Sequence, residues 1–323
     1  MNRIKIVIAD YFFPNLNHER TEFRKLGNNV EIVDCTKILP GGIKDPRQLI
    51  EYSRDCDGLI VQYAKVDAQF IGELTKCKVI AGYGIGVDTI DTQAAKSRGI
   101  WVANVPDYCI SEVANTAAMH ILNATRKLTT SRDMLIKGYF DRNNLGSIFR
   151  LEDATLALLG FGNIARDLYM KMKPFFRKAI VYDPYFTGQS NFPDVSFQNL
   201  DKTLSSADVI SIHVPLNTST RGLLSTNEFH KMKNGVIIIN TARGAIIDEE
   251  ALLNALNSGK VGFAGLDVLT IEDYMNSPFL NHERVALTPH LAWYSTEAQV
   301  ELQVKTARNV VEAILNGKPL YPI

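Results

Sequence analysis

Short apolar runs alternate along the first part of the chain with segments whose apolar positions recur at helical spacing. These runs predict buried strands over residues 4–9, 30–33, 58–61, 79–81 and 100–103. Helices are predicted in the segments that begin after residues 15, 45, 67 and 91. Because strands that alternate with helices form parallel sheets, this region predicts an α/β domain with a doubly wound parallel sheet.

A second alternating series follows a long apolar helix predicted over 111–126. Its strands are predicted over residues 155–159, 179–182, 208–213, 236–240, 263–267 and 285–288. Six strands with intervening helices predict a complete dinucleotide-binding sheet, and a last helix is predicted over 295–316. The segment 129–152 is polar and aromatic with no clear core face, which is typical of a linker or an interface arm.

The strand predicted over 155–159 leads directly into the turn Gly160-Phe161-Gly162 and a helix that starts near Asn163. In this arrangement Gly160 allows the turn and Gly162 lets the backbone approach a pyrophosphate. Ala165 takes the position of the third glycine, where helix and strand pack. The N–H groups at the start of the helix then face the anion. A turn that needs glycine only for its backbone angles is the alternative.

Asp183 ends the next predicted strand, about 20 residues after the glycine turn, where an acid accepts hydrogen bonds from an adenosine ribose. A carboxylate at this point repels a 2′-phosphate, and Pro184 and Tyr185 offer no cation to hold one. Strand, glycines, helix, second strand and acid occur in register. The sequence therefore predicts a site for NAD rather than NADP.

The composition narrows the class of protein. With 323 residues the chain exceeds the usual size of a single core, so two domains are expected. Its 35 basic and 35 acidic residues balance, which argues against a nucleic-acid surface. Four cysteines, with no C-x-x-C pair, predict buried and reduced thiols without a metal site: Cys35, Cys56, Cys77 and Cys109. The N-terminus lacks the apolar length of a signal peptide or membrane span, so a cytoplasmic location is expected.

Candidate chemistry follows three strands of the second predicted sheet. Arg243 lies in Thr241-Ala242-Arg243-Gly244, Asp267 is followed by Glu272, and His290 comes just after the last strand. Taken singly, each has a structural explanation, namely a surface ion pair, a loop cap or a satisfied histidine. Their convergence on the sheet edge that binds the nicotinamide favours a catalytic site. In the first domain, the loop 82–88 is either a tight turn or a small-anion site.

These motifs, in this order, carry a resemblance. The glycine turn, Thr241-Ala242-Arg243-Gly244, the Asp267 to Glu272 spacing and Pro289-His290 resemble the D-isomer-specific 2-hydroxyacid dehydrogenases over essentially the whole chain. Val105-Pro106-Asp107-Tyr108-Cys109 and Ala292-Trp293-Tyr294-Ser295 are most similar to the branch of the C-terminal-binding proteins and their bacterial dehydrogenase relatives. The resemblance implies a flavodoxin-like substrate domain and a Rossmann NAD-binding domain with a cleft between them.

The resemblance implies hydride transfer between NAD(H) and C2 of a small 2-hydroxy or 2-oxo acid. Arg243 would hold the substrate carboxylate and C2 oxygen, His290 would be the acid–base catalyst, and Glu272 would pair with His290 and favour the imidazolium. Substrate contacts are implied for Ile85, Gly86, Arg243, His290 and Trp293. Cofactor contacts are implied for Gly160, Phe161, Gly162, Asn163, Ile164, Asp183, Val214, Pro215, Thr241, Ala242, Arg243, Asp267 and His290.

Domain boundaries and partners are implied as well. The substrate domain would be discontinuous, comprising residues 1–105 and 293–323, and the NAD-binding domain would span 106–292. The segment 129–152 falls where the family forms its homodimer contact. The expected partners are a small-molecule acid and a second copy of the chain, with no nucleic acid, membrane or metal.

Departures from the family pattern bear on the substrate. Gly82 stands where many relatives carry a substrate-anchoring arginine, and Asp273 replaces a proline that commonly follows the glutamate. Segment 109–111 lacks the basic residues with which phosphoglycerate dehydrogenases hold a phosphate. This favours an unphosphorylated acid, with 3-phosphoglycerate as the alternative substrate. Trp293 either walls the pocket, favouring an apolar substrate side chain, or lies at a domain interface.

A different class of function also fits the resemblance. An NAD(H)-sensing binding protein of the C-terminal-binding-protein type, with vestigial catalysis, would share the fold and the cofactor. The retained Arg243, Glu272 and His290 favour the enzyme, because a sensor has less need of them. A methyltransferase that uses the glycine turn for another adenosine cofactor gives no reason for Arg243 and His290.

Overall fold

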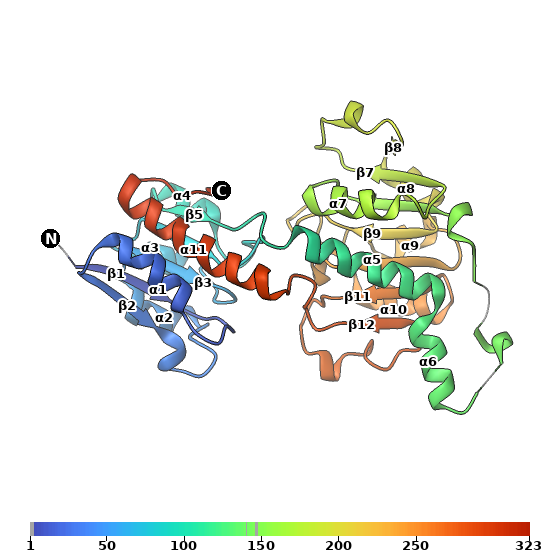
Figure 1. The fold of residues 1–323 in the computed structure, drawn as a ribbon, viewed down its shortest axis with the longest axis horizontal. Coiled ribbons are helices and arrows are strands. Elements are labelled where there is room, and N and C mark those ends of the chain that lie inside the picture. The colour runs from blue at the N-terminus through green and yellow to red at the C-terminus, as the bar shows by residue number, and fades with distance from the viewer. Residues whose placement is uncertain (1–2, 140, 146–147) are drawn as a thin grey trace. The chain divides into compact units, whose positions relative to one another are not determined.

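The computed structural model describes residues 3–139, 141–145 and 148–323, which form two compact units (Figure 1). The first unit combines Met1–Tyr108 with Ser295–Ile323, and the second is Cys109–Tyr294. The boundaries implied by the resemblance, after residues 105 and 292, lie within three residues of these. The chain therefore completes most of the first unit, builds the second, and returns to the first for its last helix.

The first unit is built on a five-stranded parallel sheet with the order β2-β1-β3-β4-β5. Its strands are β1 (Ile4–Ile8), β2 (Val30–Asp34), β3 (Gly58–Val61), β4 (Val79–Gly82) and β5 (Trp101–Ala103). Every residue of β3 and β4 is buried, because these inner strands are covered on both faces. The five strands predicted here are confirmed, and the strand order is that of the flavodoxin-like fold.

Helices cover both faces of this sheet (Figure 1). One face carries α2 (Pro46–Ser53), α3 (Ala68–Glu73) and α4 (Thr92–Ser97), and the other carries α1 (Asn17–Phe23) and α11 (Thr296–Asn316). Asp45, Asp67 and Asp91 precede α2, α3 and α4, and each carboxylate accepts a hydrogen bond from a backbone N–H of the first turn. These N-caps explain why the sequence locates the helix starts.

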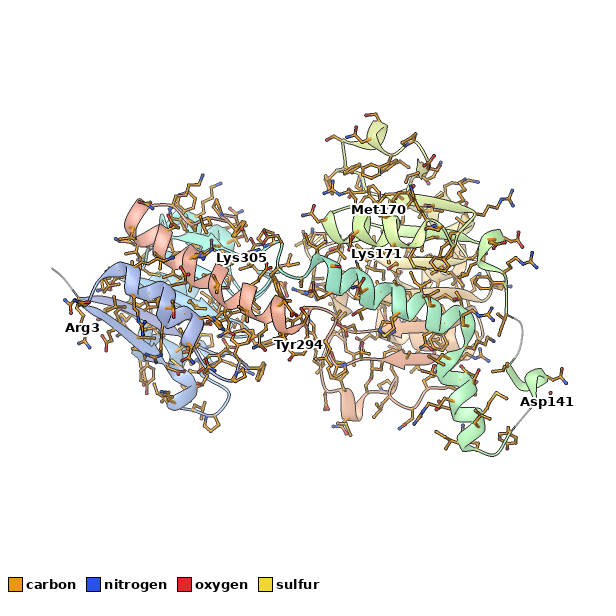
Figure 2. All side chains as sticks on the ribbon, in the orientation of Figure 1. Arg3, Asp141, Met170, Lys171, Tyr294 and Lys305 are labelled. Carbon is orange, nitrogen blue, oxygen red and sulfur yellow. The ribbon has the colours of Figure 1, made fainter. Side chains whose placement is uncertain are left out.

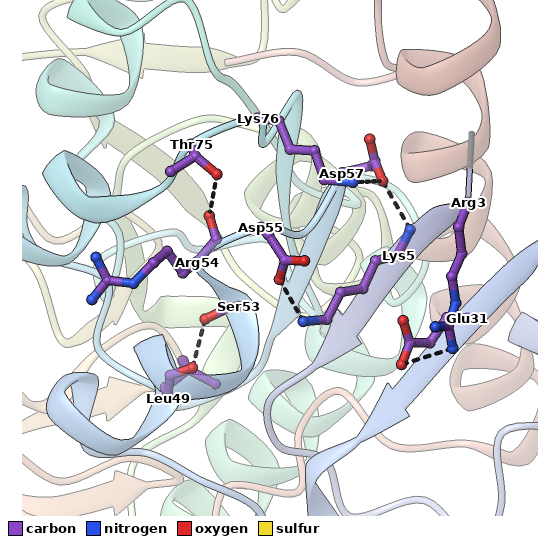
Figure 3. Close-up of polar contacts among 10 residues, drawn as sticks. All are labelled: Arg3, Lys5, Glu31, Leu49, Ser53, Arg54, Asp55, Asp57, Thr75 and Lys76. Atoms are coloured by element: carbon purple, nitrogen blue, oxygen red, sulfur yellow. Dashed lines mark hydrogen bonds and ion pairs between the residues drawn. The ribbon is translucent and has the colours of Figure 1, made fainter.

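Charged side chains tie together the amino-terminal ends of β1, β3 and β4 (Figure 3). Lys5 Nζ lies 2.5 Å from Asp55 Oδ1, and Lys76 Nζ lies 3.1 Å from Asp57 Oδ2. The same Asp57 oxygen accepts the backbone N–H of Lys5 at 2.8 Å. These contacts stabilise the edge of the sheet opposite to its carboxyl edge, where parallel sheets bind ligands.

A buried carboxylate joins α1, α11 and the loop after β4. Glu19 is fully buried, and its Oε1 accepts hydrogen bonds from Tyr83 Oη at 2.8 Å and Gln303 Nε2 at 3.0 Å. Gln303 Nε2 also donates to Asn15 O at 2.9 Å. Burial raises the pKa of Glu19, while the hydrogen bonds from Tyr83 and Gln303 oppose that rise. Each donor therefore offsets part of the cost of burying this acid.

The second unit contains a seven-stranded parallel sheet with the order β12-β11-β10-β9-β6-β7-β8. Its strands are β6 (Thr155–Leu159), β7 (Lys178–Tyr182), β8 (Val195–Phe197), β9 (Val209–Ile212), β10 (Val236–Asn240), β11 (Val261–Leu266) and β12 (Val285–Leu287). The six predicted strands are confirmed, but the prediction missed β8. This edge strand has only three residues, which is too short for a periodic pattern in the sequence, and it pairs only with β7.

Two helical layers cover this sheet (Figure 1). One contains α5 (Ile110–Arg126) and α7 (Asn163–Met172), and the other contains α8 (Leu200–Ser206), α9 (Thr226–Lys231) and α10 (Glu249–Asn257). Lys171, labelled on α7 in Figure 2, joins the first layer: its Nζ lies 2.9 Å from Ser111 Oγ and 2.5 Å from Asp167 Oδ2. A cation therefore does reach segment 109–111, from a distant part of the sequence.

The predicted arm over 129–152 begins as helix α6 (Leu128–Ile136), of which no residue is buried. Two short 3₁₀ helices follow, Arg142–Leu145 and Leu151–Asp153. Residues 140, 146 and 147 of the arm lie outside the described residues. Elsewhere, all four cysteines are buried, as predicted. In the described part of the chain, the helices are too short or too polar to cross a membrane.

Replacing Tyr83 by Phe should destabilise the first unit, because Glu19 keeps its burial and loses a donor. We expect the free energy of unfolding to fall by about 1–3 kcal/mol at neutral pH. The pKa of Glu19 is higher in the native state than in the unfolded state. As the pH rises from the unfolded pKa to the native pKa, the contribution of Glu19 to the free energy of unfolding therefore becomes less favourable. The loss of stability in Tyr83→Phe should therefore grow as the pH rises. It should be smaller at low pH, where Glu19 is protonated.

Urea unfolding monitored at several pH values measures this difference. Tyr52→Phe is the control, since this partly buried tyrosine packs against the core of the first unit and its hydroxyl makes no hydrogen bond among the described residues. An equal loss of stability in both variants, or a Tyr83→Phe deficit that does not change with pH, would contradict the assignment.

Candidate active site

The glycine turn joins β6 to α7 as a backbone cradle. Gly160 has a φ of 89°, and a Cβ at this position would lie 2.8 Å from the carbonyl oxygen of His213. Both constraints exclude a side chain. Gly162 caps α7, and its Cβ position faces open space. The start of the helix is thus left uncovered, with free room for an anion against its backbone.

Asp183, at the end of β7, holds this turn in place. Its Oδ2 accepts the backbone N–H of Phe161 at 2.8 Å, and its Oδ1 accepts that of Tyr185 at 3.0 Å. The carboxylate therefore fixes the glycine turn relative to the loop that follows β7. Its partial exposure leaves it room for a further donor, such as a ribose hydroxyl.

Phe161, between the two glycines of the turn, directs its ring away from the solvent. Its side chain is fully buried. The ring packs edge-on against Phe186, Phe192 and Phe197, with centroids 5.2, 4.9 and 5.5 Å away. Its N–H is occupied by Asp183. Phe161 thus supports the cradle from beneath by aromatic packing.

The turn after β10 presents Arg243. Asn240 clamps it, since Oδ1 accepts the N–H of Ala242 at 3.0 Å and Nδ2 donates to the carbonyl of Arg243 at 2.9 Å. A Cβ on Gly244 would lie 2.0 Å from the backbone of Leu269, so only glycine fits there. The Arg243 side chain is partly buried, and the Thr241 hydroxyl is buried without a hydrogen-bond partner in the described ranges.

Asp267, the residue after β11, connects this turn to the last strand end. Its side chain is fully buried. The carboxylate accepts hydrogen bonds from Thr288 Oγ1 at 2.6 Å, from the N–H of Leu291 at 3.0 Å and from the N–H of Ala292 at 2.9 Å. Its own N–H donates to the carbonyl of Asn240 at 2.9 Å. All the contacts of the carboxylate thus run to the loop that carries His290.

The Asp267 carbonyl extends this arrangement to the two remaining predicted residues. It accepts the N–H of His290 at 2.8 Å and the hydroxyl of Tyr274 at 3.0 Å. His290 has a φ of 51°, a left-handed conformation that these backbone bonds hold in place. Tyr274 lies two residues after Glu272. His290 Nδ1 lies 2.6 Å from Glu272 Oε1, and both side chains are partly exposed.

Other predicted residues lie near these strand ends or in the first unit. Val214 and Pro215 follow β9, directly after the His213 carbonyl that Gly160 approaches. Trp293 is partly buried and meets Tyr294 edge-on, with centroids 5.5 Å apart. In the first unit, the carbonyls of Gly84 and Ile85 accept hydrogen bonds from Val105 and Asn104. These two hydrogen bonds to carbonyl oxygens hold the loop in place. The N–H groups of Ile85 and Gly86 donate to no acceptor among the described residues.

Comparisons with known proteins bear on this arrangement. Residues 118–292 match the model of the "D-isomer specific 2-hydroxyacid dehydrogenase, NAD binding domain". The hydroxypyruvate reductase of Thermotoga maritima is 37% identical over 271 residues, which cover 83% of this chain and 88% of that protein. Human D-3-phosphoglycerate dehydrogenase is 35% identical over 301 residues, which cover 88% of this chain and 55% of that protein.

A solved structure agrees in fold over the whole length. The glyoxylate reductase of Paecilomyes thermophila matches with a TM-score of 0.87 and 28% identity, covering 100% of this chain and 99% of that one. The chain belongs to the D-isomer-specific 2-hydroxyacid dehydrogenase family. As a member of that family it is an NAD-dependent oxidoreductase that acts on CH–OH groups.

The residues of this dehydrogenase fit NAD. Gly160 admits no side chain in the tight turn, Gly162 leaves open space at the start of α7, and Asp183 supplies an anionic acceptor next to the turn. The buried Thr241 hydroxyl, without a partner in the described ranges, is a polar group that a ligand can satisfy. Burial lowers the pKa of His213 to about 4, so this imidazole beside the turn is neutral at physiological pH. Within the described residues, no group of three or more His, Cys, Asp and Glu side chains could hold a metal ion.

Several residues of this dehydrogenase site were not assigned from sequence. Asn240, Tyr274 and Thr288 position the predicted side chains through hydrogen bonds, and His120 contacts Thr288 from α5. The first three lie within five residues of a predicted site residue, so proximity along the chain is a signal that could have found them. His120 has no such signal, because it lies far from the site in sequence.

Replacing Asp183 by Asn should weaken selection for NAD over NADP. The amide oxygen can still accept the N–H of Phe161, which holds the glycine turn, while the negative charge and the acceptor for the N–H of Tyr185 are removed. We expect the preference for NADH over NADPH to fall by about tenfold, mainly through tighter NADPH binding, because one lost repulsion is worth about 1.4 kcal/mol. Fluorescence titration with each dinucleotide measures the two dissociation constants.

Asp194→Asn is the control for that titration, because it removes an exposed acid that precedes β8. An unchanged ratio of the two dissociation constants in Asp183→Asn would show that this carboxylate does not read the 2′ position.

Proposed function

We propose that this dehydrogenase works as a 2-oxo acid reductase in which Arg243, Glu272 and His290 perform the chemistry. The observation that carries the proposal is the 2.6 Å contact between His290 Nδ1 and Glu272 Oε1 beside the clamped Arg243 turn. Because Nδ1 faces Glu272, the Nε2 atom of His290 is the one available to a substrate.

The side chains fit the charge changes of the reaction. Bound NADH supplies the hydride that adds to C2 of the acid. Negative charge then develops on the C2 oxygen, where Arg243 stabilises it and His290 donates a proton from Nε2. Oxidation of the 2-hydroxy acid reverses these steps, with His290 as the base. Arg243 also holds the carboxylate through charge-assisted hydrogen bonds.

The proposed substrate is a small, unphosphorylated 2-oxo acid. The names of the hydroxypyruvate and glyoxylate reductases that resemble this chain support a small acid. Lys171 reaches segment 109–111, but its ammonium is paired with Asp167 at 2.5 Å, so it is a poor candidate for a phosphate. Exposed apolar side chains flank the Glu272–His290 pair, among them Ile271, Met275 and Leu291. They and Trp293 favour an apolar or uncharged substituent on the acid over a charged one.

We further propose that the first unit is the substrate domain, that Cys109–Tyr294 is the NAD-binding domain, and that the enzyme is a cytoplasmic homodimer. The exposed apolar face of the α6 region supports the dimer. Leu128, Leu135, Ile136 and Tyr139 are each more than half exposed, which is unusual for a cluster of large apolar side chains. A second copy covering this face would bury it.

The direct test follows NADH absorbance with a panel of 2-oxo acids. The panel contains pyruvate, hydroxypyruvate, phenylpyruvate, branched-chain acids and 3-phosphohydroxypyruvate, each also tested with NADPH. We expect one unphosphorylated acid to be strongly preferred with NADH. Preference for 3-phosphohydroxypyruvate would indicate the phosphorylated substrate. NADH binding without turnover of any acid would contradict the reductase and favour an NAD(H)-sensing binding protein.

With the preferred acid, Arg243→Ala, Glu272→Gln and His290→Ala should each lower kcat/KM by about 10²–10⁴-fold. The NADH dissociation constant of Glu272→Gln should change little, because Glu272 is not among the implied cofactor contacts. Glu297→Gln, at an exposed site on α11, is the control. Near-normal turnover in the three variants, with intact folding, would exclude these roles.

A charge on the α6 face should prevent dimerisation. Leu135→Glu combined with Ile136→Glu places two carboxylates at exposed apolar positions, and sedimentation should then report the mass of the monomer instead of twice 36.0 kDa. Met170→Glu is the control, because Met170 is exposed to a similar extent on α7 (Figure 2). A dimer that persists in the double variant would place the interface elsewhere.

A further inference from the structure

We infer that His120 and Thr288 are positioning residues for His290 and act on it through Asp267. This inference rests on the proposed function, because it assigns a role relative to the proposed acid–base catalyst. Thr288 Oγ1 donates to Asp267 Oδ1 at 2.6 Å, and His120 Nε2 lies 3.2 Å from the same Thr288 oxygen. A chain of hydrogen bonds thus runs from helix α5 to the loop that carries His290.

The direction of each proton in this chain can be deduced. The Asp267 carboxylate receives the N–H groups of Leu291 and Ala292, so it acts as an acceptor. Thr288 has one hydroxyl proton and gives it to Asp267. The Thr288 oxygen can therefore only accept from His120, which requires a proton on Nε2 of the histidine ring.

The other ring nitrogen of His120 supports this assignment. Its Nδ1 is buried and has no hydrogen-bond partner in the described part of the chain. If Nδ1 carries no proton, the only unpaired group is one hydrogen-bond acceptor. If the ring were protonated, a positive charge would be buried and the Nδ1–H donor would have no acceptor. Burial lowers the pKa of His120, and the nearby Asp267 opposes that shift only in part. The ring is therefore neutral, with its proton on the nitrogen that faces Thr288.

Packing fixes the ring where the chain requires it. His120 is 1% exposed on α5, which lies against β10 and β11 (Figure 1). A Cβ on Gly265 of β11 would lie 2.7 Å from the Cβ of His120, so glycine is what allows the helix to bring this side chain to the strand end. The close approach places an imidazole under the active-site loop.

The consequence for catalysis follows from the loop geometry. Asp267 fixes both sides of His290, through its carbonyl on the histidine N–H and through its carboxylate on the two following amides. If Thr288 and His120 hold the carboxylate in one orientation, they also hold His290 near Glu272. Loss of either hydrogen bond frees the carboxylate to rotate, and a displacement of about 1 Å at the catalytic ring can cost about 10²-fold in rate.

The chain offers a matched set of variants to test this. Thr288→Val removes the hydroxyl and keeps the shape, whereas Thr288→Ser restores it. His120→Leu removes the donor, whereas His120→Gln places an amide donor at a similar reach. With the preferred 2-oxo acid, Thr288→Val and His120→Leu should lower kcat by about tenfold or more, while KM and the NADH dissociation constant change by less than about threefold. Thr288→Ser and His120→Gln should recover most of kcat.

A double variant and a control separate positioning from general damage. Thr288→Val with His120→Leu should lose little more than either single change, because both interrupt one chain. Thr306→Val is the control for buried threonines, since its hydroxyl is buried without a partner in the described ranges. Wild-type kcat in both Thr288→Val and His120→Leu would overturn the inference and leave the reductase assignment intact.

Histidine nitrogen NMR provides a readout that does not depend on turnover. The protein has six histidines, and the His120 signals are assigned by their loss in His120→Gln. We expect the wild-type signals of a neutral ring protonated at Nε2, and we expect the His290 signals to shift in Thr288→Val. A ring protonated at Nδ1, or His290 signals unaffected by Thr288→Val, would overturn the inference. These outcomes hold even if the panel of acids shows no reduction.

Discussion

The hydrogen bonds of Asp267 are the interaction on which the rest of the site depends. This fully buried residue binds the β10 end through its own N–H and binds the loop after β12 through its carboxylate. Its carbonyl reaches His290 and the Tyr274 side chain. A carboxylate removed from water is costly unless it is fully hydrogen-bonded. The bonds that satisfy this carboxylate therefore fix the loop that carries His290, and the backbone groups of Asp267 link that loop to Asn240 and Tyr274.

The sheet makes that arrangement possible. In a parallel sheet the carboxyl ends of neighbouring strands meet at one edge, and β10, β11 and β12 are neighbours here. Three short loops from consecutive strands can thus present an arginine, an acid and a histidine within a small region. The glycine turn leaves β6 at the same edge, so this turn and the Glu272–His290 pair are supported by one sheet. Charged clamps such as Lys5 with Asp55 lie at the opposite edge of their own sheet.

Unusual backbone conformations in this site are held in place by several surrounding contacts. His290 adopts a left-handed φ of 51°, which a non-glycine residue adopts at some energetic cost. Two hydrogen bonds at its own N–H, to Asp267 O and Thr288 O, hold this conformation. Gly160 and Gly244 meet backbone atoms at distances that no side chain tolerates. Hydrogen bonds and close packing therefore constrain the backbone at these three positions of the site.

By itself, the amino-acid sequence determined the alternation of elements, the NAD cradle and the family, because apolar periodicity, glycine spacing and N-capping acids such as Asp45 are local signals. It also indicated Arg243, Glu272 and His290 through their order along the chain. The tertiary structure alone decided which residues from distant parts of the sequence contact the site and its surroundings. Phe161 became a buried aromatic support, Lys171 reached segment 109–111, and His120 came under the His290 loop. Contacts between residues so far apart in sequence depend on how helices pack on the sheet, and no local pattern encodes them.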